Sequence, residues 1–192
     1  MFRISNSTGS LTHVKDIRLD GKSVLMAVSP DRRFLYVSLR NDPYSITSLA
    51  IDARDGTLSL LGKCAAADST VYKAVDRGGR FLLSACNPAN SARKSGLLTI
   101  NVIGPQRVVQ SPGIRIRTPP KLHSVIPDPT NRYLFAVSCD GDYIMRFAFN
   151  VSLGEASSDR LTPVVLLPKS GPRHMRFHPN GKLFNVVNEY DG

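Results

Sequence analysis

The chain has 192 residues, of which 42% are hydrophobic and 21% charged, a composition typical of folded globular proteins that argues against disorder. No apolar run reaches the length of about eighteen residues that a membrane-spanning helix needs, and residues 1–6 lack the apolar stretch of a secretory signal, so we expect a cytoplasmic protein with no membrane partner. Because Cys64, Cys86 and Cys139 form no Cys-x-x-Cys pair, we expect their thiols to be reduced. The net charge of +10 comes from basic residues scattered along the whole chain, which disfavours a nucleic-acid partner and agrees with a small anionic substrate.

The first predicted strands cover residues 1–5 and 11–19, joined by a turn at Ser7-Thr8-Gly9. Two pairs of strands follow in the next part of the chain. Their ranges are 24–29 with 34–39, and 45–51 with 58–64, where Asp55-Gly56 supplies the tight turn between the last two. Each pair combines two short apolar or β-branched runs with a turn of Pro, Asp, Asn or Gly, and this pattern predicts antiparallel hairpins.

The first of these hairpins recurs along the chain. In each copy a basic residue precedes the second apolar run, at positions 33, 80, 132 and 182, so the spacings are 47, 52 and 50 residues. A four-stranded unit of about fifty residues is the size of a propeller blade, whereas sandwiches repeat single strands and helical solenoids need a 3.6-residue apolar period. The sequence therefore predicts an all-β protein, a β-propeller of four-stranded blades.

The chain divides into about four blade equivalents. We expect a half-blade at 1–22, blades at about 23–68, 69–118 and 119–170, and a half-blade at 171–192 whose strands cover 173–177 and 183–188. Four blades could close into a ring only if the two half-blades combined into one. Otherwise the half-blades leave unpaired strand edges, which predict self-association.

Three motifs stand in blade order near the end of the chain. They are Leu122-His123-Ser124 followed by Pro127-Asp128-Pro129, then Gly171-Pro172-Arg173-His174 with Phe177-His178-Pro179-Asn180-Gly181, and finally Asn188-Glu189. Together they resemble the β-propeller lactonase family, which contains the propeller-type 6-phosphogluconolactonases. Members of that family have seven blades and about twice this length, so the resemblance implies that this chain corresponds to the front half. Asn87-Pro88 and the polar stretch 89–94 depart from a glycine-rich turn that many relatives have there.

The resemblance implies that the parent protein hydrolyses a sugar lactone, with conversion of 6-phosphogluconolactone to 6-phosphogluconate as the favoured reaction. It also implies that this reaction needs neither a metal nor another cofactor. It also implies that His123, Arg173 and Glu189 are catalytic and face the mouth of the central channel, and that Arg173 and His174 bind substrate. The residue types suit this chemistry, because a histidine can act as general base or acid near neutral pH and a guanidinium can stabilise an oxyanion or an anionic substituent. Glu189 would assist proton transfer or orient His123.

Each of these residues also has a purely structural interpretation. His123 could simply hydrogen-bond its own turn, and Arg173 could form an ion pair with Glu189. His174 and His178 are four residues apart, but Pro179 ends that strand and no further ligand completes a metal site, so we expect no metal and a turn-capping His178.

Two more groups receive no catalytic role. Asp140-Gly141-Asp142 is typical of a turn between strands, and His13 lies in the opening hairpin.

Two other functions stay open from the sequence. The chain could be a non-catalytic or truncated propeller that acts as a binding scaffold. The same histidine, arginine and glutamate could also support a muconate-type lactonizing cycloisomerase.

Overall fold

A computed structural model of the protein describes residues 1–87, 95–158 and 163–192, so the polar stretch 89–94 lies outside the described residues. In these three ranges all regular structure is β, in seventeen strands, and no helix long and apolar enough to cross a membrane occurs among them. The predicted all-β class is thereby confirmed.

Three antiparallel sheets form most of the molecule. The first has the order β3-β4-β5-β6, with β3 (Ser23–Val28), β4 (Phe34–Leu39), β5 (Ser45–Ile51) and β6 (Leu58–Ala65). The second has the order β7-β8-β9-β10, with β7 (Thr70–Val75), β8 (Phe81–Cys86), β9 (Gly96–Val102) and β10 (Ile114–Thr118). The third has the order β11-β12-β13-β14, with β11 (Leu122–Pro127), β12 (Tyr133–Ser138), β13 (Tyr143–Asn150) and β14 (Glu155–Ser158), and the short β15 (Val164–Val165) also pairs with β13.

A two-stranded sheet lies at each end of the chain. β1 (Phe2–Ile4) pairs with β2 (Leu11–His13), and β16 (Pro172–Phe177) pairs with β17 (Phe184–Asn188). The prediction of a strand extending to Leu19 is wrong, because the pairing with β1 ends at the Phe2↔His13 pair and residues 14–19 have no described strand partner. The hairpins predicted further along agree with the observed strands to within one residue.

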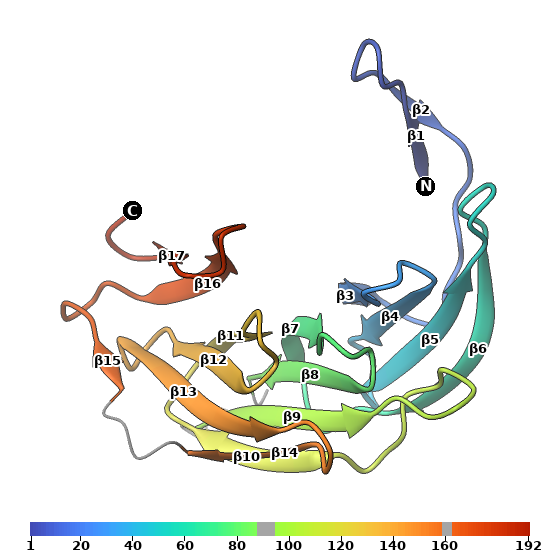
Figure 1. The fold of residues 1–192 in the computed structure, drawn as a ribbon. Coiled ribbons are helices and arrows are strands. Elements are labelled where there is room, and N and C mark those ends of the chain that lie inside the picture. Colours follow the sequence, from blue (N-terminus) through green and yellow to red (C-terminus); the bar gives the residue numbers. More distant parts are fainter. Residues whose placement is uncertain (88–94, 159–162) are drawn as a thin grey trace.

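The sheets stand side by side like the blades of a propeller (Figure 1). The innermost strands β3, β7, β11 and β16 contact one another in this order, while β6, β10 and β14 lie on the outer side. Facing sheets bury a shared apolar layer, in which Phe81 and Leu98 of the second sheet pack with Leu122 and Phe147 of the third. This face-to-face packing explains why both faces of the central strands are apolar.

A buried carboxylate closes the turn after two of the innermost strands. Asp76 accepts hydrogen bonds from the backbone amides of Arg80 and Phe81 at 2.6 and 2.7 Å. Asp128, at the same place in the next blade, accepts from the amides of Arg132 and Tyr133 at 2.8 Å each. The repeated acidic turn residue in the sequence is therefore a structural acceptor for amides that would otherwise be unpaired.

The turns of neighbouring blades are also joined to each other. Asn131, whose φ of 61° places it in the left-handed region that asparagine tolerates, donates from Nδ2 to Asp76 at 2.8 Å. Its Oδ1 accepts from the amide of Arg77 at 3.0 Å. The second and third blades are thus held together by a side-chain clamp in addition to their apolar layer.

We predict that Asp76→Ala lowers the free energy of unfolding by about 3 kcal/mol, because the buried amides of its turn lose their acceptor. Urea unfolding followed by circular dichroism measures this change. Asp191→Ala, which removes an exposed carboxylate near the end of the chain, is the control and should leave the midpoint unchanged. Equal midpoints for the two variants would contradict the structural role of Asp76.

Candidate functional site

His123 and Arg173 occupy the same structural position in neighbouring blades. The pairing of β11 with β12 shifts register between Leu122 and Ser124, so His123 is the extra residue of a β-bulge. The pairing of β16 with β17 shifts between Pro172 and His174, and Arg173 is the extra residue there. Because a bulge redirects the side chain at its position, it offers one reason why both residues leave the regular alternation of their strands.

Glu189 reaches the same place from the neighbouring strand. It follows β17 directly, and its amide donates to the carbonyl of Gly171 at 2.7 Å, which closes the inner hairpin. Cys139 makes the equivalent bond in the preceding blade, from its amide to the carbonyl of Lys121 at 2.9 Å. The ends of two consecutive hairpins therefore bring together residues that are 50 or more positions apart in the sequence.

The three predicted catalytic side chains meet at this point. Oε2 of Glu189 lies 3.3 Å from Nε of Arg173 and 3.9 Å from Nε2 of His123. The ion pair between Arg173 and Glu189, which the sequence left open as a structural alternative, is present. It coexists with the approach of Glu189 to the histidine, so one carboxylate serves both neighbours.

Burial and neighbouring charges shift the pKa values of His123 and Glu189. The His123 side chain is only 11% exposed, and this burial, reinforced by the charge of Arg173, lowers the pKa of its imidazole below the ordinary value of 6.5 although Glu189 opposes the shift. Partial desolvation acts to raise the pKa of Glu189, but Lys121 and Arg173 outweigh it and hold that pKa below its usual value. At neutral pH the site therefore contains a neutral histidine beside a carboxylate and a guanidinium.

Two further residues complete the charge network around Glu189, and the sequence did not single them out. Nζ of Lys121 lies 3.4 Å from Oε1 of Glu189 and donates to the hydroxyl of Tyr190 at 2.6 Å. The Tyr190 hydroxyl in turn donates to Oδ1 of Asp140 at 2.7 Å. Lys121 directly precedes β11 and Tyr190 directly follows Glu189, so only the pairing of two blades joins them.

His174, on β16, connects the site to β7 of the second sheet. Its ring centroid lies 6.1 Å from that of His123 and 5.5 Å from that of Tyr72 on β7. Burial, together with the charge of Arg173, lowers its pKa as well. A predicted substrate-binding residue is therefore next to the predicted catalytic histidine.

The remaining candidates have structural partners. His178 accepts from the amide of Asn180 through Nδ1 at 3.2 Å, as expected for a turn-capping residue. Asp142 lies in the turn between β12 and β13 and accepts from the amides of Lys169 and Gly171 at 2.7 and 2.8 Å, so it fixes the loop that leads into β16. His13 pairs with Asp16 at 2.9 Å, in the hairpin at the start of the chain. Within residues 1–87, 95–158 and 163–192, no three potential His, Cys, Asp or Glu ligands cluster around a common point.

We predict that Lys121→Met raises the pKa of Glu189, because the carboxylate loses the ammonium group that lies 3.4 Å from its Oε1. A carbon-13 NMR titration of the Glu189 carboxyl group measures the shift. Lys63→Met removes a lysine that pairs with Asp20 in the first blade and should leave the titration of Glu189 unchanged. An unaltered Glu189 titration in Lys121→Met would contradict the assigned network.

Comparisons with known proteins match the chain to one family model and to curated relatives. The family model described as "Lactonase, 7-bladed beta-propeller" matches residues 1–192. The 6-phosphogluconolactonase of Yersinia pestis (strain Pestoides F) is 34% identical over 184 residues, which are 96% of this chain and 52% of that protein. That of Yersinia enterocolitica serotype O:8 / biotype 1B is 34% identical over 183 residues, which are 95% and 52% of the two chains.

The same likeness appears among solved structures. The periplasmic gluconolactonase of Pseudomonas aeruginosa matches with a TM-score of 0.84 and 21% identity, over 98% of this chain and 56% of that one. At this identity the likeness concerns the fold. The chain spans about half the length of the curated relatives it matches.

Proposed function

Because this chain belongs to the lactonase family of seven-bladed β-propellers, we propose that it carries catalytic residues for the hydrolysis of a sugar lactone. The observation that supports this proposal most is the convergence of His123, Arg173 and Glu189, with Oε2 of Glu189 within 3.9 Å of Nε2 of the histidine and 3.3 Å of Nε of the arginine. The names of the curated relatives favour 6-phosphogluconolactone as the substrate.

In the proposed reaction a water molecule attacks the lactone carbonyl. Neutral His123 takes a proton from this water as general base, and the guanidinium of Arg173 stabilises the negative charge that develops on the carbonyl oxygen. The acyl C–O bond of the ring then breaks, and the ring oxygen takes the proton from the imidazolium of His123, which yields the open sugar acid and returns the histidine to its neutral form. Glu189 holds Arg173 and stabilises the imidazolium that forms on His123 during the attack.

The proposal keeps three predictions that come from the sequence. Half-blades cover residues 1–22 and 171–192, and blades cover about 23–68, 69–118 and 119–170. The protein acts in the cytoplasm, and open strand edges lead it to self-associate.

We predict that His123→Ala lowers kcat/KM for 6-phosphogluconolactone by about a hundredfold or more, the usual contribution of a general base. We expect Arg173→Ala to lower kcat by a similar factor, because it removes the donor for the oxyanion. Acid release followed with a pH indicator measures both rates against the spontaneous hydrolysis of the lactone.

His13→Ala, which replaces an exposed histidine of the opening hairpin, is the matched control and should keep the rate of the unaltered chain. Full activity in both His123→Ala and Arg173→Ala would reject the proposed site. A chain without any lactone hydrolysis would instead favour the binding scaffold, and conversion of a muconate in the same assay would favour the cycloisomerase.

The pH dependence provides a separate test of the role of His123. Burial lowers the pKa of this imidazole below 6.5, so the neutral form that a general base requires persists into mildly acidic solution. We predict that kcat/KM, measured from about pH 5 to pH 8, rises with pH and levels off with an apparent pKa below 6.5. A rate that falls as His123 loses its proton would assign it the role of general acid.

A further inference from the structure

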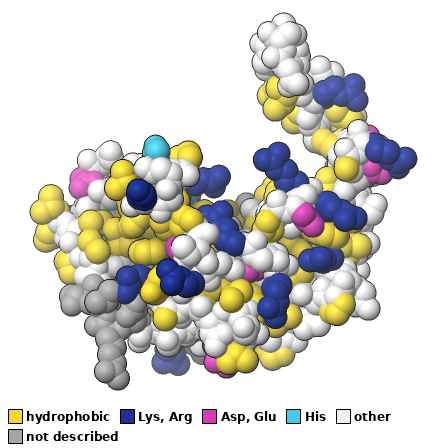
Figure 2. All heavy atoms as spheres, in the orientation of Figure 1, with side chains coloured by type: hydrophobic (Ala, Val, Ile, Leu, Met, Phe, Trp, Pro, Cys, Tyr) yellow, Lys and Arg dark blue, Asp and Glu magenta, His cyan; other side chains and the backbone are white. Residues whose placement is uncertain are grey.

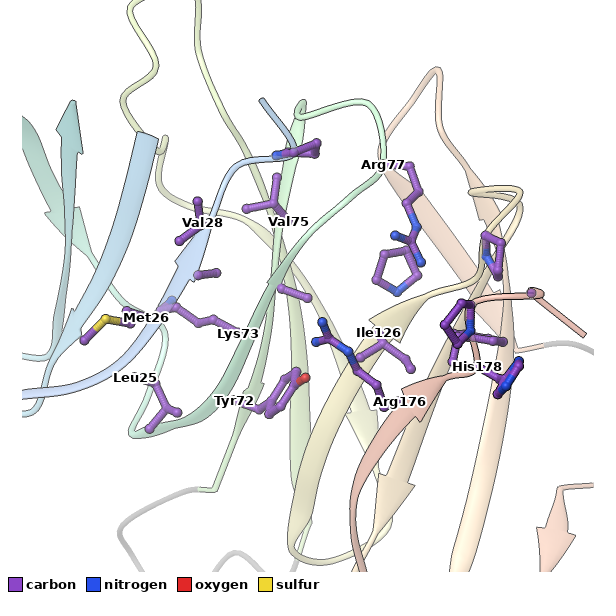
Figure 3. A pocket seen from close by; sticks show the side chains of 18 residues that line it. Leu25, Met26, Val28, Tyr72, Lys73, Val75, Arg77, Ile126, Arg176 and His178 are labelled. Carbon is purple, nitrogen blue, oxygen red and sulfur yellow. The ribbon is translucent and has the colours of Figure 1, made fainter. Parts of the chain in front are cut away.

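The described part of the chain has a second candidate site, a cleft whose lining residues do not include His123, Arg173 or Glu189. It has a volume of about 810 Å³ and lies along the innermost strands β3, β7, β11 and β16, towards the turns at which they end (Figure 3). Tyr72, Arg77, Ile126, Arg176 and His178 are among its lining residues. The volume falls within the range that small-molecule sites occupy.

The cleft wall carries positive charge without any negative charge. Arg77, Arg176 and Lys73 line it, and no Asp or Glu is among its lining residues. The carboxylates of Asp76 and Asp128, in the turns that follow β7 and β11, accept hydrogen bonds from backbone amides. On the face of the molecule that Figure 2 presents, Lys and Arg side chains outnumber those of Asp and Glu.

Both arginines line the cleft, and they differ in how they are held. Arg176 is exposed on β16 and points into the cleft beside Tyr72, and no hydrogen bond or ion pair ties its guanidinium to another residue of the described ranges (Figure 3). Nε of Arg77 donates to the carbonyl of Asp128 at 3.3 Å, which fixes the position of that side chain at the cleft edge. Guanidinium groups match the oxygens of a phosphate through paired hydrogen bonds.

Lys73 adds a buried charge behind the same wall. It is 5% exposed, and its amine donates to Oγ of Ser84 at 3.0 Å. Burial lowers its pKa to about 8, so the amine remains largely protonated at neutral pH although no carboxylate pairs with it in the described part of the chain. An anion in the cleft would stabilise this charge.

The cleft and the candidate catalytic site are neighbours along β16. His174 and Arg176 are two residues apart on that strand, so they project on the same side about 6.6 Å from each other. The ring of His174 lies next to both His123 and Tyr72, which places it between the two sites. A ligand the size of one sugar ring with its substituent can therefore contact both.

We propose that this cleft binds the phosphate monoester of a phosphorylated sugar lactone, with Arg176 and Arg77 as the principal contacts and the lactone carbonyl beside His123. The proposal rests on the proposed function for the reacting end of the substrate. It adds the residues that would distinguish a phosphorylated lactone from an unphosphorylated one.

Calorimetric titration of the full chain with 6-phosphogluconate and with gluconate tests the proposal without requiring catalysis. We expect the phosphorylated acid to bind at least about tenfold more tightly, because one charge-assisted hydrogen bond contributes roughly this factor. Arg176→Gln should abolish most of this preference. Arg117→Gln is the matched control, since it removes an exposed arginine from the outer strand β10, and it should retain the preference.

The outcomes of this titration test the phosphate site separately from the proposed lactone hydrolysis. Equal or undetectable binding of the two acids by the unaltered chain, or a preference that survives in Arg176→Gln, would overturn the phosphate site. Preferential binding that depends on Arg176, in a chain that hydrolyses no lactone, would uphold the phosphate site and reject the proposed function. In an active chain, Arg176→Gln should raise KM for 6-phosphogluconolactone about tenfold and leave the KM for gluconolactone unchanged.

Discussion

The structure depends on satisfying the backbone amides of the turn that closes each inner hairpin. In two consecutive blades a buried aspartate does this, and Asn131 joins the turn of one blade to that of the other. Since an amide buried without an acceptor is costly, these turns admit little variation in geometry. The innermost strands β7 and β11 are thereby joined at their turn ends, and β11 carries His123 of the candidate site.

The candidate site uses the repeat by placing different residues at equivalent positions. The extra residue of the bulge is His123 in one blade and Arg173 in the next, and the residue that closes the hairpin is Cys139 in one and Glu189 in the next. A single scaffold position thus supplies an imidazole or a guanidinium according to the blade. Glu189 lies among Lys121, Arg173 and His123, so its negative charge is compensated while the buried histidine stays neutral.

Two ends of the same inner strands carry two kinds of chemistry. The starts of β11 and β16 hold the groups proposed for proton transfer and oxyanion stabilisation, and the turn ends hold a cleft with basic walls. His174 and Tyr72 lie between them. In this arrangement the reacting lactone and the bound phosphate of a substrate would occupy different sites. Binding of the phosphate in the cleft would then help to position the lactone beside His123.

The all-β class, the period of about fifty residues and most strand positions could be predicted from the sequence, because hairpin turns and short apolar runs are local features. The resemblance of motifs that each lie within one blade also predicted His123, Arg173, Glu189 and His174 as site residues. Tertiary structure alone decided that Lys121, Tyr190 and Asp140 surround Glu189, and that Arg77 and Arg176 share a cleft. These groups come from different blades, and only the lateral packing of sheets, which has no short-range signal in the sequence, brings them together.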